Sequence, residues 1–216
     1  MKAVTHTNHR QGTIESLRKD FVVFIYPAKD INDEGAGPRV EQFLRMAHEH
    51  GMVNAGPART GDRFLVAPDR VVNRPGRTGS AYAVFDDKEK VTALVKDLIR
   101  ADWGLSIVVS GLFDDVDDIC AQAGIKRHTV QCSLGIWGQV DRLPPEAILD
   151  IATMCGHGMV SFDLVRRMAR EISQGRVSLE EAARTLARPC SCGIFNPKRA
   201  QELLSEMVAG GLQGMS

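Results

Sequence analysis

The hydrophobic pattern of this chain changes at one point, near residue 143, and that change limits the folds open to it. Before this point, short apolar runs such as "FVVFIYPA" and "AYAVF" read as strands and alternate with amphipathic segments. After it, only helical spacing is found, in residues 144–156, 160–175, 178–187 and 196–208. We therefore predict an α/β or α+β region with a small mixed sheet over residues 1–142, and an all-helical C-terminal subdomain over residues 143–216.

Strand and helix patterns follow each other in the first region. Helices are expected at residues 38–51, 86–104 and 112–124, and a further strand at residues 105–111. This alternation predicts at least one parallel crossover. In the Gly/Pro/Arg-rich stretch 54–80, the best strand candidates are Phe64–Val66 and Val71–Val72, and residues 126–138 are expected to form a strand or an ordered loop.

Composition excludes several classes of partner. The chain has 216 residues with 27 basic and 27 acidic side chains, so no overall field favours nucleic acid or an anionic membrane. Its apolar runs are too short for a membrane span, and the N-terminus lacks the apolar core of a signal peptide. We expect a cytoplasmic protein whose partners are a small-molecule substrate or a redox protein.

Five cysteines are present, an odd number in a chain that does not need disulfides for stability. In a reducing compartment they are free thiols or metal ligands. Cys120 is in step with Val116 and Ile119 on a predicted helix, so it is interpreted as a core residue. The other four are Cys132, Cys155, Cys190 and Cys192.

These four cysteines share a setting that favours a metal site. Each has a glycine within three residues, which lets backbone amides approach the sulfur. Two of their segments precede predicted helices with N-caps at Ser161 and Asn196, and the positive end of a helix dipole favours thiolate. The sequence therefore predicts Cys132, Cys155, Cys190 and Cys192 as metal ligands.

An iron–sulfur cluster, preferably of the 4Fe–4S type, is the first interpretation. Such a cluster needs cysteine sulfurs and nearby amides, and glycine-rich turns supply both. Zinc is the alternative, because His157 in "CGHG" could complete a set of four ligands. The C-x-C spacing of Cys190 and Cys192 matches no standard cluster signature. His128 and His157 are the candidate acid/base residues.

One local resemblance concerns the segment "MCGHG", residues 154–158. It resembles the segment of the proline racemase and hydroxyproline epimerase family that carries a catalytic cysteine. The resemblance implies that Cys155 is a thiolate base that removes a proton alpha to a carboxylate, with "PCSCG" supplying a partner thiol. It covers five residues of a family built of longer, two-lobed chains, and Met159 stands where the family has threonine.

Three functions remain open from the sequence. The first is a cytoplasmic iron–sulfur protein that acts in redox or cluster-dependent small-molecule chemistry. The second is a thiol- or zinc-dependent enzyme with Cys155 as the activated cysteine. The third is a non-catalytic binding protein whose cysteines are incidental.

Overall fold

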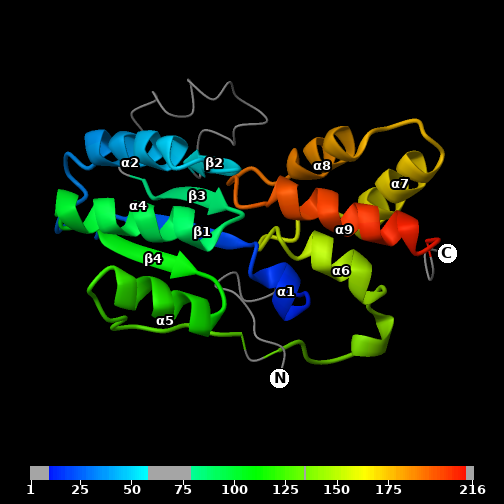
Figure 1. The fold of residues 1–216 in the computed structure, drawn as a ribbon, viewed down its shortest axis with the longest axis horizontal. Helices are drawn as coiled ribbons and strands as arrows, with labels where there is room; N and C mark the ends of the chain where they lie inside the picture. Colours follow the sequence, from blue (N-terminus) through cyan, green and yellow to red (C-terminus); the bar gives the residue numbers. More distant parts are fainter. Residues whose placement is uncertain (1–9, 58–78, 134, 213–216) are drawn as a thin grey trace.

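The computed structural model describes residues 10–57, 79–133 and 135–212. Its N-terminal half contains a four-stranded antiparallel sheet. The strands are β1 (Phe21–Tyr26), β2 (Asn54–Pro57), β3 (Ala81–Phe85) and β4 (Ser106–Ser110), in the spatial order β2-β3-β1-β4 (Figure 1). Each neighbouring pair is antiparallel. The predicted combination of an α/β or α+β region with C-terminal helices is confirmed, but the sheet is not mixed among its described strands.

The structure contains the predicted parallel crossover, but the two strands that it joins are not neighbours in the sheet. Strands β3 and β4 run in the same direction and are joined by a helix, as the pattern indicates, yet β1 lies between them. Strands β1 and β2 likewise run in the same direction with β3 between them. Two interlocked split βαβ units result, so every strand meets an antiparallel neighbour.

Alternate residues of β1 point into two different cores. Phe21, Val23 and Ile25 face helices α2 (Gly37–Glu49) and α4 (Lys88–Ala101), with α5 (Phe113–Gln122) beside α4. Val22 and Phe24 face the opposite way, toward the C-terminal helices. A strand buried on both faces explains why "FVVFIY" has no polar position.

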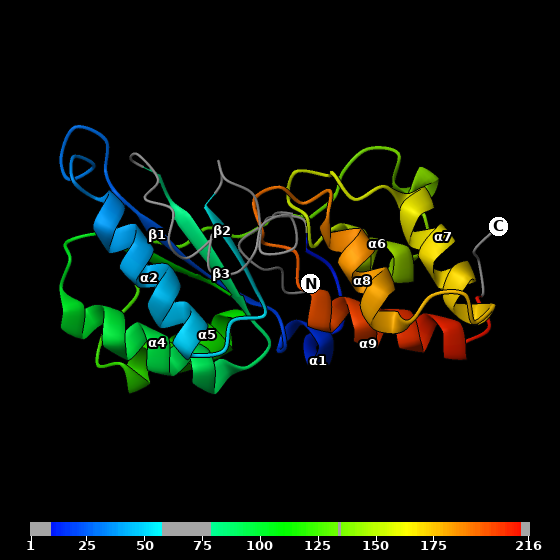
Figure 2. The same ribbon diagram turned by 90° about the horizontal axis from the view of Figure 1, so that it is seen from above.

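The C-terminal region contains α6 (Glu146–Ala152), α7 (Phe162–Ser173), α8 (Leu179–Ala187) and α9 (Pro197–Ala209). These helices lie together at one side of the sheet (Figures 1 and 2). Their apolar faces form one core, which also contains Val22, Phe24 and Val84 of the sheet. The short helices α1 (Ile14–Leu17) and η1 (Val140–Arg142) complete the described set. The boundary between residues 142 and 143 remains a prediction.

The two predicted helix caps are confirmed. Ser161 Oγ accepts a hydrogen bond from the amide of Leu164 at the start of α7. Asn196 Oδ1 accepts from the amides of Lys198 and Arg199 at the start of α9, where Pro197 is the first residue. These caps fix the points at which the two cysteine-bearing loops enter helices.

Some expected strands are not found where the sequence placed them. Residues 126–133 and 135–138 have no helix or strand, so this segment is a loop. Phe64–Val66 and Val71–Val72 lie outside the described residues. Strand β2, which the sequence assigned to loop, forms at Asn54–Pro57 because it pairs with β3. Within the described ranges, the helices are all too short or too polar to cross a membrane.

Candidate metal centre

Three of the four predicted ligand cysteines lie together in the core of the C-terminal region. Cys155 is in the turn that follows α6, and Cys190 and Cys192 are in the loop between α8 and α9. Their exposed fractions are 2%, 0% and 4%, respectively. Two loops that are 35 residues or more apart in the sequence are therefore brought to one buried place.

The sulfur atoms and one imidazole form a chain of close contacts. The Sγ atoms of Cys190 and Cys192 are 3.8 Å apart, and Cys192 Sγ is 3.7 Å from His157 Nδ1. At the other end of this row of contacts, Cys155 is hydrogen bonded to Cys190. His157 itself is exposed, so this row of side chains extends from the core to the surface.

Main-chain amides point at all three sulfurs. Cys155 receives hydrogen bonds from the amides of His157 and Met159, Cys190 from that of Phe195, and Cys192 from that of Ile194. Donors of this kind stabilise the thiolate form, which is the form that binds metals. The glycines next to the cysteines allow the chain to turn back and aim these amides, as the sequence indicated.

The three thiols differ in acidity. The hydrogen bond to Cys190 and burial raise the pKa of Cys155 well above its ordinary value of 9.0. The hydrogen bond from Cys155 lowers the pKa of Cys190, but the bond to Cys192 and burial outweigh it and raise this pKa to about 11. The hydrogen bond from Cys190 lowers the pKa of Cys192. Negative charge therefore collects first on Cys192, beside His157, and Cys155 is a poor candidate for the thiolate base that the racemase resemblance implies.

The "PCSCG" loop packs against strand β2. Gly193 has φ +76°, and a Cβ atom at this position would lie 2.5 Å from the carbonyl oxygen of Ala55. Asn54 Nδ2 donates a hydrogen bond of 2.9 Å to the carbonyl oxygen of Phe195. The glycine that follows the second cysteine is therefore required for the close approach of loop and strand.

A buried ionic group lies behind the two cysteine loops. Arg10, Asp20 and Arg199 are at most 1% exposed. Asp20 accepts a hydrogen bond from Arg10 Nη1 and one of 2.9 Å from Arg199 Nη1. Arg10 Nη2 donates to the carbonyl oxygens of Met154 and Ile194. Sequence reasoning missed this group, although Arg199 lies at helical spacing among the apolar residues of α9, which is an unusual place for a charge.

The remaining predicted residues lie elsewhere. Cys132 is exposed in the loop that follows α5, while the other three ligand candidates are buried together. His128 is exposed in the same loop, with Nδ1 2.7 Å from Thr129 Oγ1. Cys120 is 9% exposed on α5, which confirms its interpretation as a core residue.

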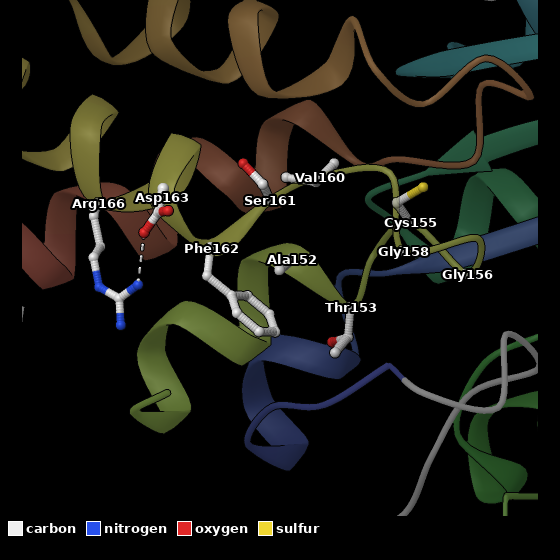
Figure 3. Close-up of a pocket in the computed structure, with 10 residues that line it drawn as sticks. All are labelled: Ala152, Thr153, Cys155, Gly156, Gly158, Val160, Ser161, Phe162, Asp163 and Arg166. Atoms are coloured by element: carbon white, nitrogen blue, oxygen red, sulfur yellow. Dashed lines mark hydrogen bonds and ion pairs between the residues drawn. The ribbon is translucent and has the colours of Figure 1, made fainter. Parts of the chain in front are cut away.

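A cavity of about 560 Å³ adjoins the first cysteine loop (Figure 3). Its lining runs from Ala152 on α6 to Arg166 on α7 and includes Cys155. In Figure 3 the Cys155 sulfur points away from the ring of Phe162, which also lines the cavity. The cavity therefore adjoins the loop that carries Cys155.

The thiols are not spaced around an ion as they stand. Among the residues that the structure describes, no group of three or more Cys, His, Asp or Glu side chains has the arrangement of a metal site. The described arrangement is instead a hydrogen-bonded row of thiols that ends at an imidazole. Its donors are nevertheless those of a transition-metal site, namely three sulfurs and one nitrogen.

Comparison with models of protein families, with curated proteins and with solved structures finds no match to this chain. The functional argument therefore depends on the geometry and chemistry of the residues themselves.

Proposed function

We propose that this protein binds a single tetrahedral metal ion, zinc in the first place, through Cys155, Cys190, Cys192 and His157. The observation that carries the proposal is the pair of distances at Cys192. Zinc lies about 2.3 Å from sulfur and about 2.0–2.1 Å from nitrogen, so two sulfurs of one tetrahedron are about 3.8 Å apart, and sulfur and nitrogen about 3.6 Å. The separations of 3.8 Å and 3.7 Å agree with these edges.

Completing the tetrahedron requires a local adjustment of Cys155. This side chain is already hydrogen bonded to Cys190, and a change of its χ1 rotamer is the adjustment that we propose for bringing its sulfur to the third position. Metal binding would replace the shared thiol protons and release them, as usual for thiolate ligands. The amides aimed at the sulfurs would then stabilise the metal-bound thiolates.

The exposure of His157 bears on what such a site could do. A set of three cysteines and one histidine closes the coordination of zinc, as in structural sites. Here the nitrogen ligand is exposed and lies between Gly156 and Gly158, which permit it to move. Release of His157 would leave an open position on the metal for a water molecule or a small-molecule substrate, which is the arrangement of catalytic zinc sites.

An iron–sulfur cluster is the second candidate. It is favoured by the amide donors at all three sulfurs, which such clusters require for their negative charge. Three cysteines would leave one iron open unless Cys132 supplied a fourth ligand from its exposed loop. The short contact between Cys190 and Cys192 favours zinc, because cysteines of a cluster bind separate irons and must lie further apart.

The test is metal and acid-labile sulfide analysis of protein purified without oxygen, together with its absorption spectrum. One zinc per chain without sulfide would support the first candidate, and iron with sulfide would support the second. Cys192→Ser should lose the metal, whereas Cys120→Ser should retain it, because Cys120 lies on α5 outside the group. A folded, reduced protein that takes up neither metal would refute both candidates.

A further inference from the structure

We infer that Arg10 is the positioning residue of this metal centre, because its guanidinium group forms hydrogen bonds with both ligand loops and so links them to each other. The inference rests on the proposed metal binding. Arg10 Nη2 donates to the carbonyl oxygen of Met154, 3.2 Å away, and to that of Ile194. Met154 directly precedes Cys155, and Ile194 follows Cys192 by two residues. One nitrogen atom therefore joins two loops that carry different ligands.

The position of the guanidinium group is itself fixed by an ion pair with Asp20. Its Nη1 atom pairs with Asp20, the residue before β1, and both side chains are 0% exposed. Asp20 also accepts hydrogen bonds from Asn196 Nδ2 at 3.1 Å and from Arg199 Nη1 at 2.9 Å. Because these partners come from the start of α9 and of the first strand, Arg10 has a fixed place relative to both.

The charges of this group complement a metal–thiolate centre. Arg10 and Arg199 are two permanent cations, and Asp20 is one anion, so one positive charge remains in a buried site. A zinc ion with three thiolates and a neutral imidazole carries one negative charge. An uncompensated buried charge is costly, and a metal–thiolate centre on the other side of the loops would balance it.

The bond geometry explains why arginine is required. Arginine has a planar fork that can donate in two directions at once, toward the carboxylate and toward the two carbonyls. Lysine would keep the charge but lose this fork, and methionine would lose both. We therefore expect Arg10→Lys to fold and bind metal with misplaced ligands, and Arg10→Met to bind more weakly still.

The test measures metal release and ligand geometry separately. Zinc release from each variant is timed with a coloured chelator, and cobalt replaces zinc so that its sulfur charge-transfer and d–d bands report the coordination. We expect Arg10→Lys to release zinc about tenfold to a hundredfold faster than the wild type, with altered cobalt bands, since loss of a partner that orients metal ligands has effects of this size.

Two controls separate positioning from general loss of stability. Arg18→Met removes an arginine whose side chain is 59% exposed and forms an ion pair with Asp115. Leu94→Ala weakens the core on the far face of the sheet without touching the loops. Both should retain wild-type cobalt bands, even though Leu94→Ala lowers the free energy of unfolding.

Each outcome decides the inference. Wild-type release rates and cobalt bands in both Arg10 variants would overturn it and leave the proposed metal binding intact. An Arg10→Lys protein that stays unfolded in excess zinc would also overturn it, because the residue would then serve the fold as a whole. A wild-type protein that binds neither zinc nor cobalt would refute the proposed function and the inference together.

Discussion

Substitution of Gly193 by alanine tests whether the cysteine loop depends on its contact with the sheet. Gly193 has φ +76°, a conformation that costs an alanine about 1–2 kcal/mol. The added Cβ would also lie 2.5 Å from the carbonyl oxygen of Ala55 and 2.9 Å from the amide nitrogen of Gly56. Both of these atoms belong to the backbone of β2, so the loop must move away from the strand.

The movement has a cost that can be estimated from the hydrogen bond beside it. Asn54 Nδ2 donates to the carbonyl oxygen of Phe195, and Asn54 is fully buried. Breaking such a bond leaves buried polar atoms unsatisfied, at about 1–3 kcal/mol. Together with the backbone strain, we expect Gly193→Ala to lower the free energy of unfolding by about 2–5 kcal/mol.

Gly175→Ala is the matched control. Gly175 follows α7 with φ +69°, but a Cβ at this position meets no atom within 4 Å. Its substitution should therefore cost only the backbone strain, about 1–2 kcal/mol. Urea denaturation of both variants, with equal slopes, gives the difference directly. Equal losses of stability in the two variants would refute the claim that the loop is held against β2.

Three further predictions concern the cap of α9, the thiols and one carboxylate. Asn196→Ala should lower the free energy of unfolding by about 2–4 kcal/mol, because Asn196 is buried and forms hydrogen bonds with four partners. Ser178→Ala should lower it by about 1 kcal/mol, because Ser178 caps an exposed helix end. Maleimide should label Cys132 rapidly in the native protein and the four buried cysteines only on unfolding, as peptide mapping would show. The hydrogen bond from Arg100 lowers the pKa of Asp97, so its stabilisation is complete above its ordinary value of 3.8 and is lost as the pH falls through the lower folded value. Acid titration of Asp97→Asn should show a smaller loss of stability in this range than the wild type.

Local sequence signals predicted the elements of this fold better than their arrangement. The run "FVVFIY" and the cap of α9 at Asn196 are local, and both are where the sequence places them. Strand β2 has the sequence Asn-Ala-Gly-Pro, which is typical of turns, and is a strand because Ala55 and its neighbours pair with β3. Pairing with a strand that is distant in the sequence overrides local preference, and no local pattern reports it.

The candidate metal centre shows the same contrast between local sequence signals and contacts with distant residues. Glycines and helix caps identified the two loops that carry Cys155, Cys190 and Cys192, because these features act within a few residues. The sequence grouped Cys132 with these three, because its surroundings in the chain are also rich in glycine, whereas its side chain is exposed in the fold. It also gave no indication that Arg10 reaches loops 144 and 184 residues away.

The position of the centre bears on the predicted division of the chain at residue 143. The ligand loops belong to the helical region, yet they are held by Asn54 on β2 and by Arg10 and Asp20 before β1. The same core includes Val22 and Phe24 of the sheet. Because a metal bound by these loops would stabilise every segment that positions them, its binding free energy would act on the sheet as well as on the helices. The helical region is thus a separate part of the sequence pattern, but its candidate centre depends on contacts from both sides of the boundary.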